Sequence, residues 1–454
     1  MLTFWIALVS GLLLVACVGA AAEPQAQGKE LVTNGDFAAA GAGDLPAGWT
    51  VWQPDWDKAR CTVTRTGEGL LVEAPGRPNA VGGVNQEIRG IRGGQAYAIS
   101  ASCRLKDVSD RMRTPLVRIT WTKGGQAIHP AGSMIDGPLP GGPEAAFADV
   151  LVAPAEADGA LLSLEVKWPR GGSVLWRHAS VRQAAAAPKP RKARIGTVYL
   201  RPKDSTPQRN MELWCAKIDQ AGKLGLDIVC LCESIKQPGT TAGPVEVAET
   251  IPGPDTLALG QAAARNKLWV VAGLMERDGD ALYNTAVLID RQGKIAGKYR
   301  KVHLPREEWR KGIAPGKEYP VFQTDFGRVG IMICYDWFFP EAAGIFARHG
   351  AEVLFAPTWG TTWRDKDGCV EGENIFRVRA RDNGIYLVPS VYDGSSMVID
   401  PLGRIVATSD GEKEGVYWAE VDLAAREPLW WVGHWRRLAP LHRMPETYGP
   451  IRDE

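Results

Sequence analysis

The segment Val-Gly-Ile-Met-Ile-Cys-Tyr-Asp-Trp-Phe-Phe-Pro-Glu, residues 329–341, decides the fold. Its first five residues form an apolar run that predicts a buried β-strand. Cys334 follows at the end of this run, and Pro340 begins a helical pattern that reaches His349 and stops at Gly350. A buried strand, a short turn and a helix in this order are typical of an α/β protein with an open sheet.

Two further predicted strands end in reactive residues. The apolar run Asp-Ile-Val-Cys-Leu-Cys, residues 227–232, is followed by Glu233, and the segment Gly-Lys-Tyr-Arg, residues 297–300, is followed by Lys301. Ligand groups in open α/β sheets gather at the carboxyl ends of strands. We therefore expect a carboxylate, an ammonium group and the Cys334 thiol to converge at one edge, as a base, a cation and a nucleophile.

Strands and helices alternate from residue 194 to the end of the chain, with some antiparallel pairing. An apolar stripe predicts a helix over Met211–Leu224, and Asp255 is the expected N-cap of a second helix over Thr256–Asn266. The other predicted elements are strands Ile195–Leu200, Ile228–Cys232, Leu268–Leu274 and Val353–Ala356, and a hairpin of Tyr283–Ile289 with Ile295–Tyr299.

The region 27–183 has a different pattern, in which short alternating runs are separated by Gly and Pro clusters. This pattern predicts an antiparallel β-sandwich, with strands at Ala96–Cys103, Leu116–Trp121, Leu161–Val166 and Val174–Val181. Residues 184–193 break the periodicity with Ala, Pro and basic residues, and predict a linker to a second domain over 194–454.

The opening of this sandwich, Leu-Val-Thr-Asn-Gly-Asp-Phe at 31–37 and Leu-Pro-Ala-Gly-Trp at 45–49, resembles carbohydrate-binding jelly-roll modules related to galactose-binding domains. The resemblance implies either glycan binding or a supporting role for a neighbouring domain. Cys61 and Cys103 are the only cysteines of this region, and a disulfide between them is an open question at this point.

Residues 1–22 have the features of an export signal. Phe4–Val18 is nearly all apolar, and Ala20–Ala22 provides small residues for cleavage. Leu-Val-Ala-Cys at 14–17 also resembles a lipoprotein signal, in which Cys17 would carry the lipid. An uncleaved apolar helix is a third alternative, since no basic residue precedes the apolar run. We expect export to the periplasm or outside the cell.

The composition excludes several classes of function. A formal charge of +1 over 454 residues gives no field to attract nucleic acid. The six histidines are scattered, and Cys230 and Cys232 lie within an apolar run that is better explained by core packing than by zinc ligation. We expect neither a metal nor an organic cofactor.

Glu233 after its strand, Tyr-Arg-Lys-Val-His-Leu at 299–304 and Ile-Cys-Tyr-Asp-Trp-Phe-Phe-Pro-Glu at 333–341 resemble the three signature regions of the nitrilase superfamily of carbon-nitrogen hydrolases. Residues 379–383 and 395–403 resemble later blocks of the family. The resemblance implies a four-layer αββα sandwich, frequent pairing of copies into homodimers or larger homo-oligomers, and hydrolysis of non-peptide C–N bonds without a cofactor.

The resemblance also implies a role for each residue. Cys334 would be the nucleophile, with its thiolate favoured by Lys301 and by the helix that begins near Pro340. Glu233 would be the general base and acid, and Lys301 would stabilise the oxyanion together with a backbone N–H after Cys334. Taken singly, these residues could instead be a buried cysteine, a capping or salt-bridging carboxylate and a solvated lysine.

A second glutamate normally follows the lysine in this family. Glu307 and Glu308 both lie in range, and the spacing to Pro315–Gly316 favours Glu308. Tyr335, Trp337 and Trp359 are expected to line the substrate pocket, although core packing alone would also explain aromatic residues there.

The expected reaction is hydrolysis of a small amide or N-carbamoyl compound through a thioester. Cys-Tyr-Asp resembles the amidase and carbamoylase branches more than the true nitrilases, which tend to have Cys-Trp-Glu, so nitrile hydrolysis is the alternative within the superfamily. The alternative from another class is a non-catalytic, sugar-binding surface protein.

Overall fold

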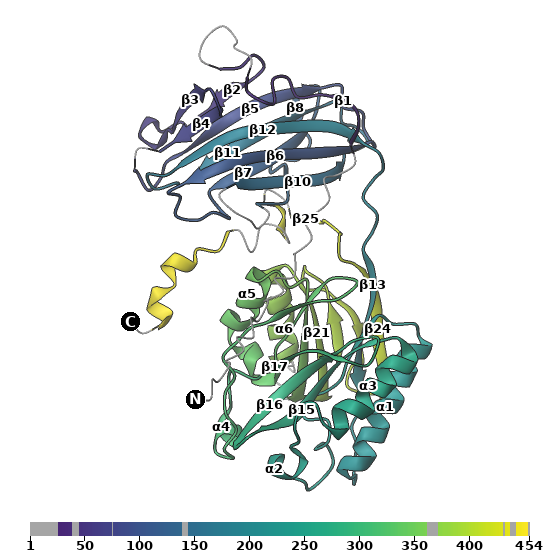
Figure 1. The fold of residues 1–454 in the computed structure, drawn as a ribbon. Helices are drawn as coiled ribbons and strands as arrows, with labels where there is room; N and C mark the ends of the chain where they lie inside the picture. The colour runs from purple at the N-terminus through teal and green to yellow at the C-terminus, as the bar shows by residue number, and fades with distance from the viewer. Residues whose placement is uncertain are drawn as a thin grey trace, which may run out of the picture. The chain divides into compact units, whose positions relative to one another are not determined.

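The computed structural model describes residues 26–38, 45–74, 76–138, 144–360, 371–429, 432–435 and 442–452 (Figure 1). The chain divides into two compact units between Pro188 and Lys189. The predicted signal over 1–22, with Cys17, lies outside the described residues, and so does Cys369. No helix in the described ranges is long and apolar enough to cross a membrane.

The N-terminal unit consists of two antiparallel sheets. The first has the order β10-β6-β12-β4-β3, with β1 on β12, and the second has the order β2-β5-β11-β7-β8, with β9 on β7. The strands are β1 (Ala26–Glu30), β2 (Thr50–Trp52), β3 (Thr62–Thr66), β4 (Gly69–Glu73), β5 (Val81–Arg89), β6 (Ala96–Lys106), β7 (Pro115–Lys123), β8 (Gln126–Ala127), β9 (Ser133–Met134), β10 (Glu144–Val152), β11 (Gly159–Lys167) and β12 (Ser173–Ala184), and a 3₁₀ turn covers Asp57–Ala59.

Alternate residues of both sheets fill one shared core, which contains Leu70 from β4, Val84 from β5 and the fully buried Trp176 from β12. This two-sheet arrangement follows from the period-two pattern of the sequence. The four predicted strands fall within β6, β7, β11 and β12 and are confirmed. Cys61 and Cys103 are free, buried thiols, so the disulfide left open by the sequence is not present.

The C-terminal unit contains two further six-stranded sheets. The first, which we call sheet C, has the order β17-β16-β15-β14-β13-β24. The second, which we call sheet D, has the order β18-β19-β20-β21-β22-β23. Their strands are β13 (Lys192–Tyr199), β14 (Ile228–Cys230), β15 (Trp269–Asp278), β16 (Ala281–Ile289), β17 (Ile295–Arg300), β18 (Val321–Gln323), β19 (Arg328–Ile331), β20 (Val353–Gly360), β21 (Tyr386–Asp393), β22 (Met397–Ile399), β23 (Ile405–Thr408) and β24 (Gly415–Asp422), and the short β25 (Pro428–Leu429) and β26 (Gly433–His434) pair separately.

Helices cover the outer faces of both sheets. Their bounds are α1 (Pro207–Lys223), α2 (Pro244–Val247), α3 (Pro254–Asn266), α4 (Arg306–Trp309), α5 (Pro340–Arg348) and α6 (Glu371–Asn383), with 3₁₀ turns at Cys334–Phe338, Pro445–Thr447 and Gly449–Arg452. In Figure 1, α1 and α3 lie side by side on the sheet C side, and α5 and α6 lie on the sheet D side. Trp214 and Leu259 bury the α1 and α3 faces against sheet C.

The inner faces of sheets C and D pack against each other. Their shared apolar core includes Ile195, Val271 and Phe355. Two buried hydroxyls also join the sheets: Thr197 Oγ1 donates to the carbonyl of Pro389 at 2.7 Å, and Ser390 Oγ donates to the carbonyl of Val198 at 2.7 Å. The predicted αββα sandwich of four layers is confirmed for this unit.

Several predicted boundaries differ from the structure. Asp255 is not the N-cap of α3, because the helix begins two residues earlier with Gly253 at the cap, where the Thr256 hydroxyl bonds the Gly253 backbone. The Asp255 carboxylate instead pairs with Lys236. Strands β14 and β19 end two residues before the predicted ends, because the chain turns there to present Glu233 and Cys334. The sequence pattern gave no signal for α6, which is rich in polar residues.

The core of the C-terminal unit is complete within that unit, so we expect the fragment 189–454 to fold alone. A fragment that begins at residue 194 should be less stable, by about 1 kcal/mol or more, because it lacks the start of β13 and the Arg191–Glu352 ion pair. Denaturant titration of both fragments measures this difference. An insoluble 189–454 fragment would contradict the assignment of a self-sufficient core.

Candidate active site

Glu233 lies in a tight turn that begins three residues after the end of β14, against the neighbouring strand β15. Gly273 of β15 is so close to this turn that a Cβ on it would lie 2.7 Å from the Glu233 Cα. The backbone of Gly273 also bonds the turn on both sides, from its N–H to the carbonyl of Cys232 and from the Ile235 N–H to its own carbonyl. Only glycine at 273 allows this approach, which fixes the position of the Glu233 carboxylate.

Lys301 follows β17 and projects into the same region. Its Nζ is 2.9 Å from Glu233 Oε1 and 2.5 Å from Glu308 Oε1. The Lys301 side chain has no exposed surface, and that of Glu233 is 3% exposed. Of the two glutamates that the sequence offered, Glu308 is therefore the one that contacts the lysine, as its spacing favoured.

Cys334 occupies the first position of a 3₁₀ turn between β19 and α5. Its φ of 41° lies in the left-handed region, which a residue with a side chain rarely adopts without support from its surroundings. Asp336 provides that support from within the turn. Its Oδ2 accepts hydrogen bonds from the Ile333 N–H at 2.9 Å and the Tyr299 hydroxyl at 2.8 Å.

The other oxygen of Asp336 ties the turn to the segment that follows Lys301. Asp336 Oδ1 accepts the His303 N–H at 2.9 Å and lies 2.8 Å from His303 Nδ1. The His303 ring in turn stacks on Phe339, with 4.0 Å between the ring centroids. One fully buried carboxylate thus links the Cys334 turn to the chain on both sides of Lys301.

The electrostatics of Cys334 correct the expectation of a resting thiolate. Burial and the Glu233 carboxylate raise the pKa of the Cys334 thiol to about 12, whereas Lys301 and the Trp359 backbone N–H lower it. The sequence correctly associated Lys301 with the cysteine, but it gave no measure of the desolvation or of the nearby negative charge. The thiol is therefore protonated at neutral pH, and Glu233 is in place to take its proton.

The charges around Lys301 also shift its own pKa and the pKa of Glu308. Burial alone would lower the pKa of Lys301, but Glu233, Cys334 and Glu308 together raise it above its ordinary value. Burial and the Glu233 charge raise the pKa of Glu308 to about 7, against the lowering effect of Lys301. The lysine is therefore a permanent cation, while Glu308 titrates near neutral pH.

Two polar groups that sequence reasoning missed complete the site. The side chain of Asn284, on β16, donates from Nδ2 to Glu233 Oε1 at 2.7 Å and to Glu308 Oε1 at 3.3 Å. The backbone N–H of Trp359 donates to Glu233 Oε2 at 2.8 Å. The signal for Asn284 was its place within a predicted buried strand, where a polar side chain requires a partner. A backbone donor leaves no such signal.

A cavity of about 260 Å³ opens beside this cluster. Its lining includes Glu233, Asn284, Glu308 and Trp359, together with Ser234, Gln237, Pro244, Met275, Glu307, Lys311 and Ile313. Trp359 therefore lies where the sequence placed it. Trp337 does not: it is buried in the core, where its ring packs against Phe338 and Phe376.

Core packing thus accounts for Trp337, which corrects its expected place in the pocket. Tyr335 is also not among the lining residues of this cavity. Its half-buried ring packs against Phe338 and Phe339, and a contact with substrate stays a prediction.

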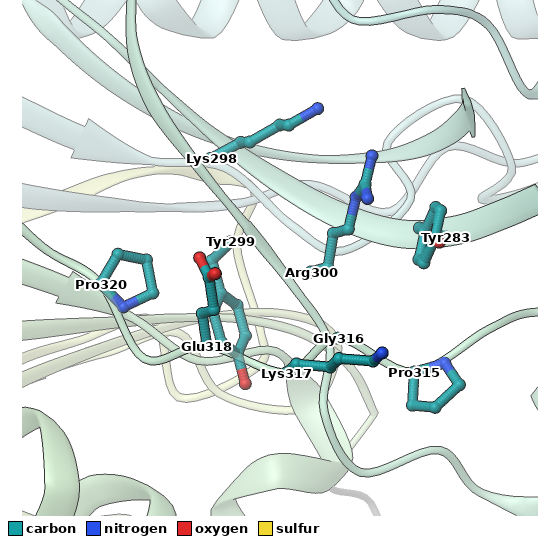
Figure 2. A pocket seen from close by; sticks show the side chains of 9 residues that line it. All are labelled: Tyr283, Lys298, Tyr299, Arg300, Pro315, Gly316, Lys317, Glu318 and Pro320. Atoms are coloured by element: carbon teal, nitrogen blue, oxygen red, sulfur yellow. The ribbon is translucent and has the colours of Figure 1, made fainter. Parts of the chain in front are cut away.

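The opposite side of β17 carries a second polar cluster, beside a cavity of about 330 Å³. Figure 2 shows Lys298 and Arg300 leaving the strand on one side and Tyr299 on the other. Lys301, the next residue in the alternation, bonds Glu233 and Glu308 of the site. Lys298 and Arg300 both bind the buried Glu276 of β15, which also accepts the Thr285 hydroxyl of β16. Burial opposes ionisation of Glu276, but Arg300, Lys298 and Thr285 lower its pKa to about 2.

Residues 194–429, more than half of the chain, match the family model for carbon-nitrogen hydrolases. The chain belongs to the carbon-nitrogen hydrolase family. It is accordingly an enzyme of the nitrilase superfamily that hydrolyses C–N bonds other than peptide bonds.

Individual relatives resemble the same part of the chain. An omega-amidase of Mus musculus is 32% identical over 234 residues, covering 47% of this chain and 83% of the relative. A probable nitrilase of Schizosaccharomyces pombe is 34% identical over 190 residues, covering 39% of this chain and 68% of the relative. The crystal structure of Nit3 from Saccharomyces cerevisiae, a nitrilase-superfamily member, shares 29% identity, with a TM-score of 0.46, over 51% of this chain and 90% of its own.

Metal-ligating residues do not gather in the described parts of the chain, where no group of three or more His, Cys, Asp or Glu side chains could hold an ion. The polar groups of the site are instead joined to one another. Glu233 bonds Lys301, Asn284 and the Trp359 N–H, and Glu308 bonds Lys301 and Asn284.

The raised pKa of Glu308 predicts a pH-dependent stability. Between about pH 4.5 and 7 the folded protein holds a proton that the unfolded chain has released, so stability should fall as the pH rises through this window. We expect the difference in free energy of unfolding between the wild type and Glu308→Gln to change by about 1 to 3 kcal/mol over this pH window, to the disadvantage of the wild type as the pH rises. Denaturant titrations of both proteins at pH 4.5 to 8 measure this. Parallel profiles would contradict a raised pKa.

The buried carboxylate of Asp336 predicts a large effect of an isosteric change. Asp336→Asn would place an N–H₂ group against the N–H groups and the Tyr299 hydroxyl that donate to the carboxylate. We expect this substitution to lower the free energy of unfolding by about 2 to 4 kcal/mol. Asp278→Asn is the matched control, because Asp278 is 61% exposed and bonds Arg300 at the surface. Its expected effect is below about 1 kcal/mol. Equal effects of the two substitutions would contradict a central role for Asp336.

Proposed function

We propose that the enzyme hydrolyses small amides or N-carbamoyl compounds through a Cys334–Glu233–Lys301 triad and a thioester intermediate. The observation that carries this proposal is the buried cluster in which Glu233 bonds Lys301 and lies against the Cys334 thiol, beside a cavity. A carboxylate, an ammonium group and a thiol in this order supply a base, an oxyanion partner and a nucleophile.

The first half of the reaction forms the thioester. Glu233 takes the Cys334 proton as sulfur bonds the amide carbon, and the electron pair of the C=O bond moves to oxygen. Lys301 has three donors, two of which bind Glu233 and Glu308, so one is left for the oxyanion, along with a backbone N–H after Cys334. The C–N bond then breaks, and nitrogen leaves as ammonia or an amine with the proton that Glu233 held.

The second half reverses these roles. Glu233 takes a proton from a water molecule as the oxygen of that water bonds the thioester carbon. The C–S bond then breaks, the acid leaves, and sulfur regains a proton. Glu308 holds the second side of Lys301 and so keeps the ammonium group in place through both halves.

Amides are the favoured substrates over nitriles on two grounds. The Cys-Tyr-Asp segment at 334–336 resembles the amidase and carbamoylase branches, and several relatives are named omega-amidases. Relatives named nitrilases support nitrile hydrolysis by the same triad as the alternative. A cavity of about 260 Å³ suits a substrate of modest size.

We propose that the N-terminal unit is a galactose-binding-like jelly roll that either supports a neighbouring domain or binds glycans. A cavity of about 380 Å³ on its second sheet supports glycan binding, because Glu87, Arg89, Thr120 and Asp158 offer hydrogen-bond partners for sugar hydroxyls. Binding to a glycan panel tests it. Glycan binding without turnover of any amide or nitrile would favour the sugar-binding surface protein over the enzyme.

We also propose that the protein is exported and that its copies associate. Residues 1–22 support cleavage before or near Glu23, or lipid attachment at Cys17, and intact mass after native export distinguishes these. Exposed Phe338 and Val378, on the α5 and α6 side, support pairing of two copies through that face. Sedimentation of the purified protein tests the oligomeric state.

The nucleophile is tested by substitution. Cys334→Ala and Cys334→Ser should each lower kcat by at least about a thousandfold, because neither offers an ionisable thiol to Glu233. Ammonia release from a panel of small amides measures the loss, and mass spectrometry of the wild type should detect an acyl group on Cys334. Cys215→Ser, a half-buried cysteine on α1, is the control and should keep the wild-type rate. A near-wild-type rate in Cys334→Ala would overturn the triad.

A further inference from the structure

Two carboxyl groups and a lysine form a second titratable cluster close to the turn that carries Glu233. Lys236 ends this turn, Asp255 lies in the first turn of α3, and Glu249 lies between α2 and α3. The Asp255 backbone N–H donates to Glu249 Oε1 at 2.6 Å, and Lys236 Nζ is 2.8 Å from Asp255 Oδ2. The side chains of Lys236 and Asp255 are only 18% and 10% exposed, so water screens their charges little.

This cluster closes a loop that forms part of the wall of the active-site cavity. Lys236 and Glu249 lie at the two ends of the segment 236–249, and Gln237 and Pro244 of this segment line the 260 Å³ cavity. The carboxyl group from the first turn of α3 contacts both ends. The contacts of the cluster therefore determine how firmly this part of the wall is held.

Other charged groups close to Glu249 in the chain or on β15 are bound elsewhere. On β15, Glu276 binds the two basic residues of β17, and Arg277 Nη2 donates to the carbonyl of Val245 within the loop at 3.1 Å. On α2, the exposed Glu246 accepts a backbone N–H at the start of its own helix. The charge on Glu249 is therefore balanced only within the cluster.

The contact between Glu249 and Asp255 depends on a proton. Their side chains share a hydrogen bond, and two ionised carboxylates could not form it because both would be acceptors. Burial and this hydrogen bond raise the pKa of Glu249 to about 7, against the lowering effects of the Asp255 backbone N–H and Lys236. With the proton the cluster is neutral. Without it, two carboxylates in contact share a single lysine and repel each other.

We propose that Glu249 is a positioning residue whose proton closes the loop 236–249 at the active-site cavity. In the protonated state, the loop keeps its lining residues at the cavity wall. Loss of the proton loosens the loop and weakens the binding of substrate, while the triad itself stays in place. The effect on substrate binding rests on the proposed amide hydrolysis, whereas closure of the loop can be measured without any substrate.

Hydrogen exchange at the bridge between the loop and β15 tests the closure. The Glu249 N–H bonds the Met275 carbonyl at 3.2 Å, and the Arg277 N–H bonds the Glu249 carbonyl at 2.8 Å. An open loop releases a proton that the closed loop holds, so opening becomes easier as the pH rises from about 4.5 to 7 and then levels off. Protection of these two amides, relative to the intrinsic rate at each pH, should fall at least about tenfold between pH 5 and 8.

Three variants assign this change to the proton. Glu249→Gln keeps a donor toward Asp255 but has no proton to lose, so its protection should change by less than about twofold over the same range. Glu249→Ala lacks the hydrogen bond and should be weakly protected at both pH values. Glu246→Gln alters an exposed residue of the same loop and is the matched control, which should follow the wild type. Where Glu249→Ala is insoluble, the comparison between the wild type and Glu249→Gln decides.

Steady-state kinetics with propionamide measure the effect on the site. The titration of Glu308 is common to the wild type and Glu249→Gln, so the ratio of their KM values isolates Glu249. We expect KM of the wild type relative to Glu249→Gln to rise at least about threefold from pH 5 to 8, with little change in the ratio of their kcat values. A release assay for ammonia gives both constants.

The possible outcomes separate this inference from the proposed function. Parallel protection profiles in the wild type and Glu249→Gln would overturn the inference, whatever the substrate of the enzyme. Different profiles with a constant ratio of KM values would overturn the role of Glu249 in positioning the site. A wild type that turns over no amide would overturn the proposed function, and the exchange profiles would still decide whether the proton closes the loop.

Discussion

A lysine ammonium group without exposed surface is the constraint on which the C-terminal unit depends. A buried charge is tolerated only where opposite charges and hydrogen bonds replace water. Lys301 meets this requirement with Glu233 on one side and Glu308 on the other. Burial raises the pKa of both Glu308 and Cys334, and the charge of Glu233 adds to this effect because one lysine is shared between two carboxylates.

The position of this lysine is set from the far side of its own strand. Arg300 and Lys298 bind Glu276, which also accepts a hydrogen bond from Thr285, so one carboxylate joins β15, β16 and β17. The neighbours of these residues, Asn284 and Lys301, point to the opposite face because side chains alternate along a strand. The ion cluster on the outer side of sheet C therefore holds the polar groups on its inner side in register.

The sequence predicted the parts of this arrangement that depend on strand ends. Apolar runs that terminate in Glu233, Lys301 and Cys334 determine where each reactive group emerges, and the layers follow from the alternation of strands and helices. Spacing favours Glu308 over Glu307 only weakly, because consecutive residues of a short helical turn differ mainly in the direction of their side chains. The structure settles which of them contacts Lys301.

Other features could not be predicted, because they depend on three-dimensional proximity. The pKa of Cys334 depends on how closely Glu233 and the surrounding protein approach the thiol, and neither quantity is encoded in local pattern. Trp337 follows the nucleophile in sequence, yet the turn carries its ring into the core. Asn284 reaches Glu233 from β16 of the same sheet, across β15, and the Trp359 N–H comes from β20 of sheet D, so that contact arises only when sheets C and D pack together.

A protonated resting thiol changes how the nucleophile should be understood. A preformed thiolate reacts with any accessible electrophile or oxidant, whereas a neutral thiol reacts slowly until a base removes its proton. In the proposed mechanism, Glu233 would supply that base where Lys301 also binds the substrate carbonyl. The negative charge that raises the pKa of the resting thiol would then be the charge that accepts its proton during attack, so the proposal confines reactivity to the complex with substrate.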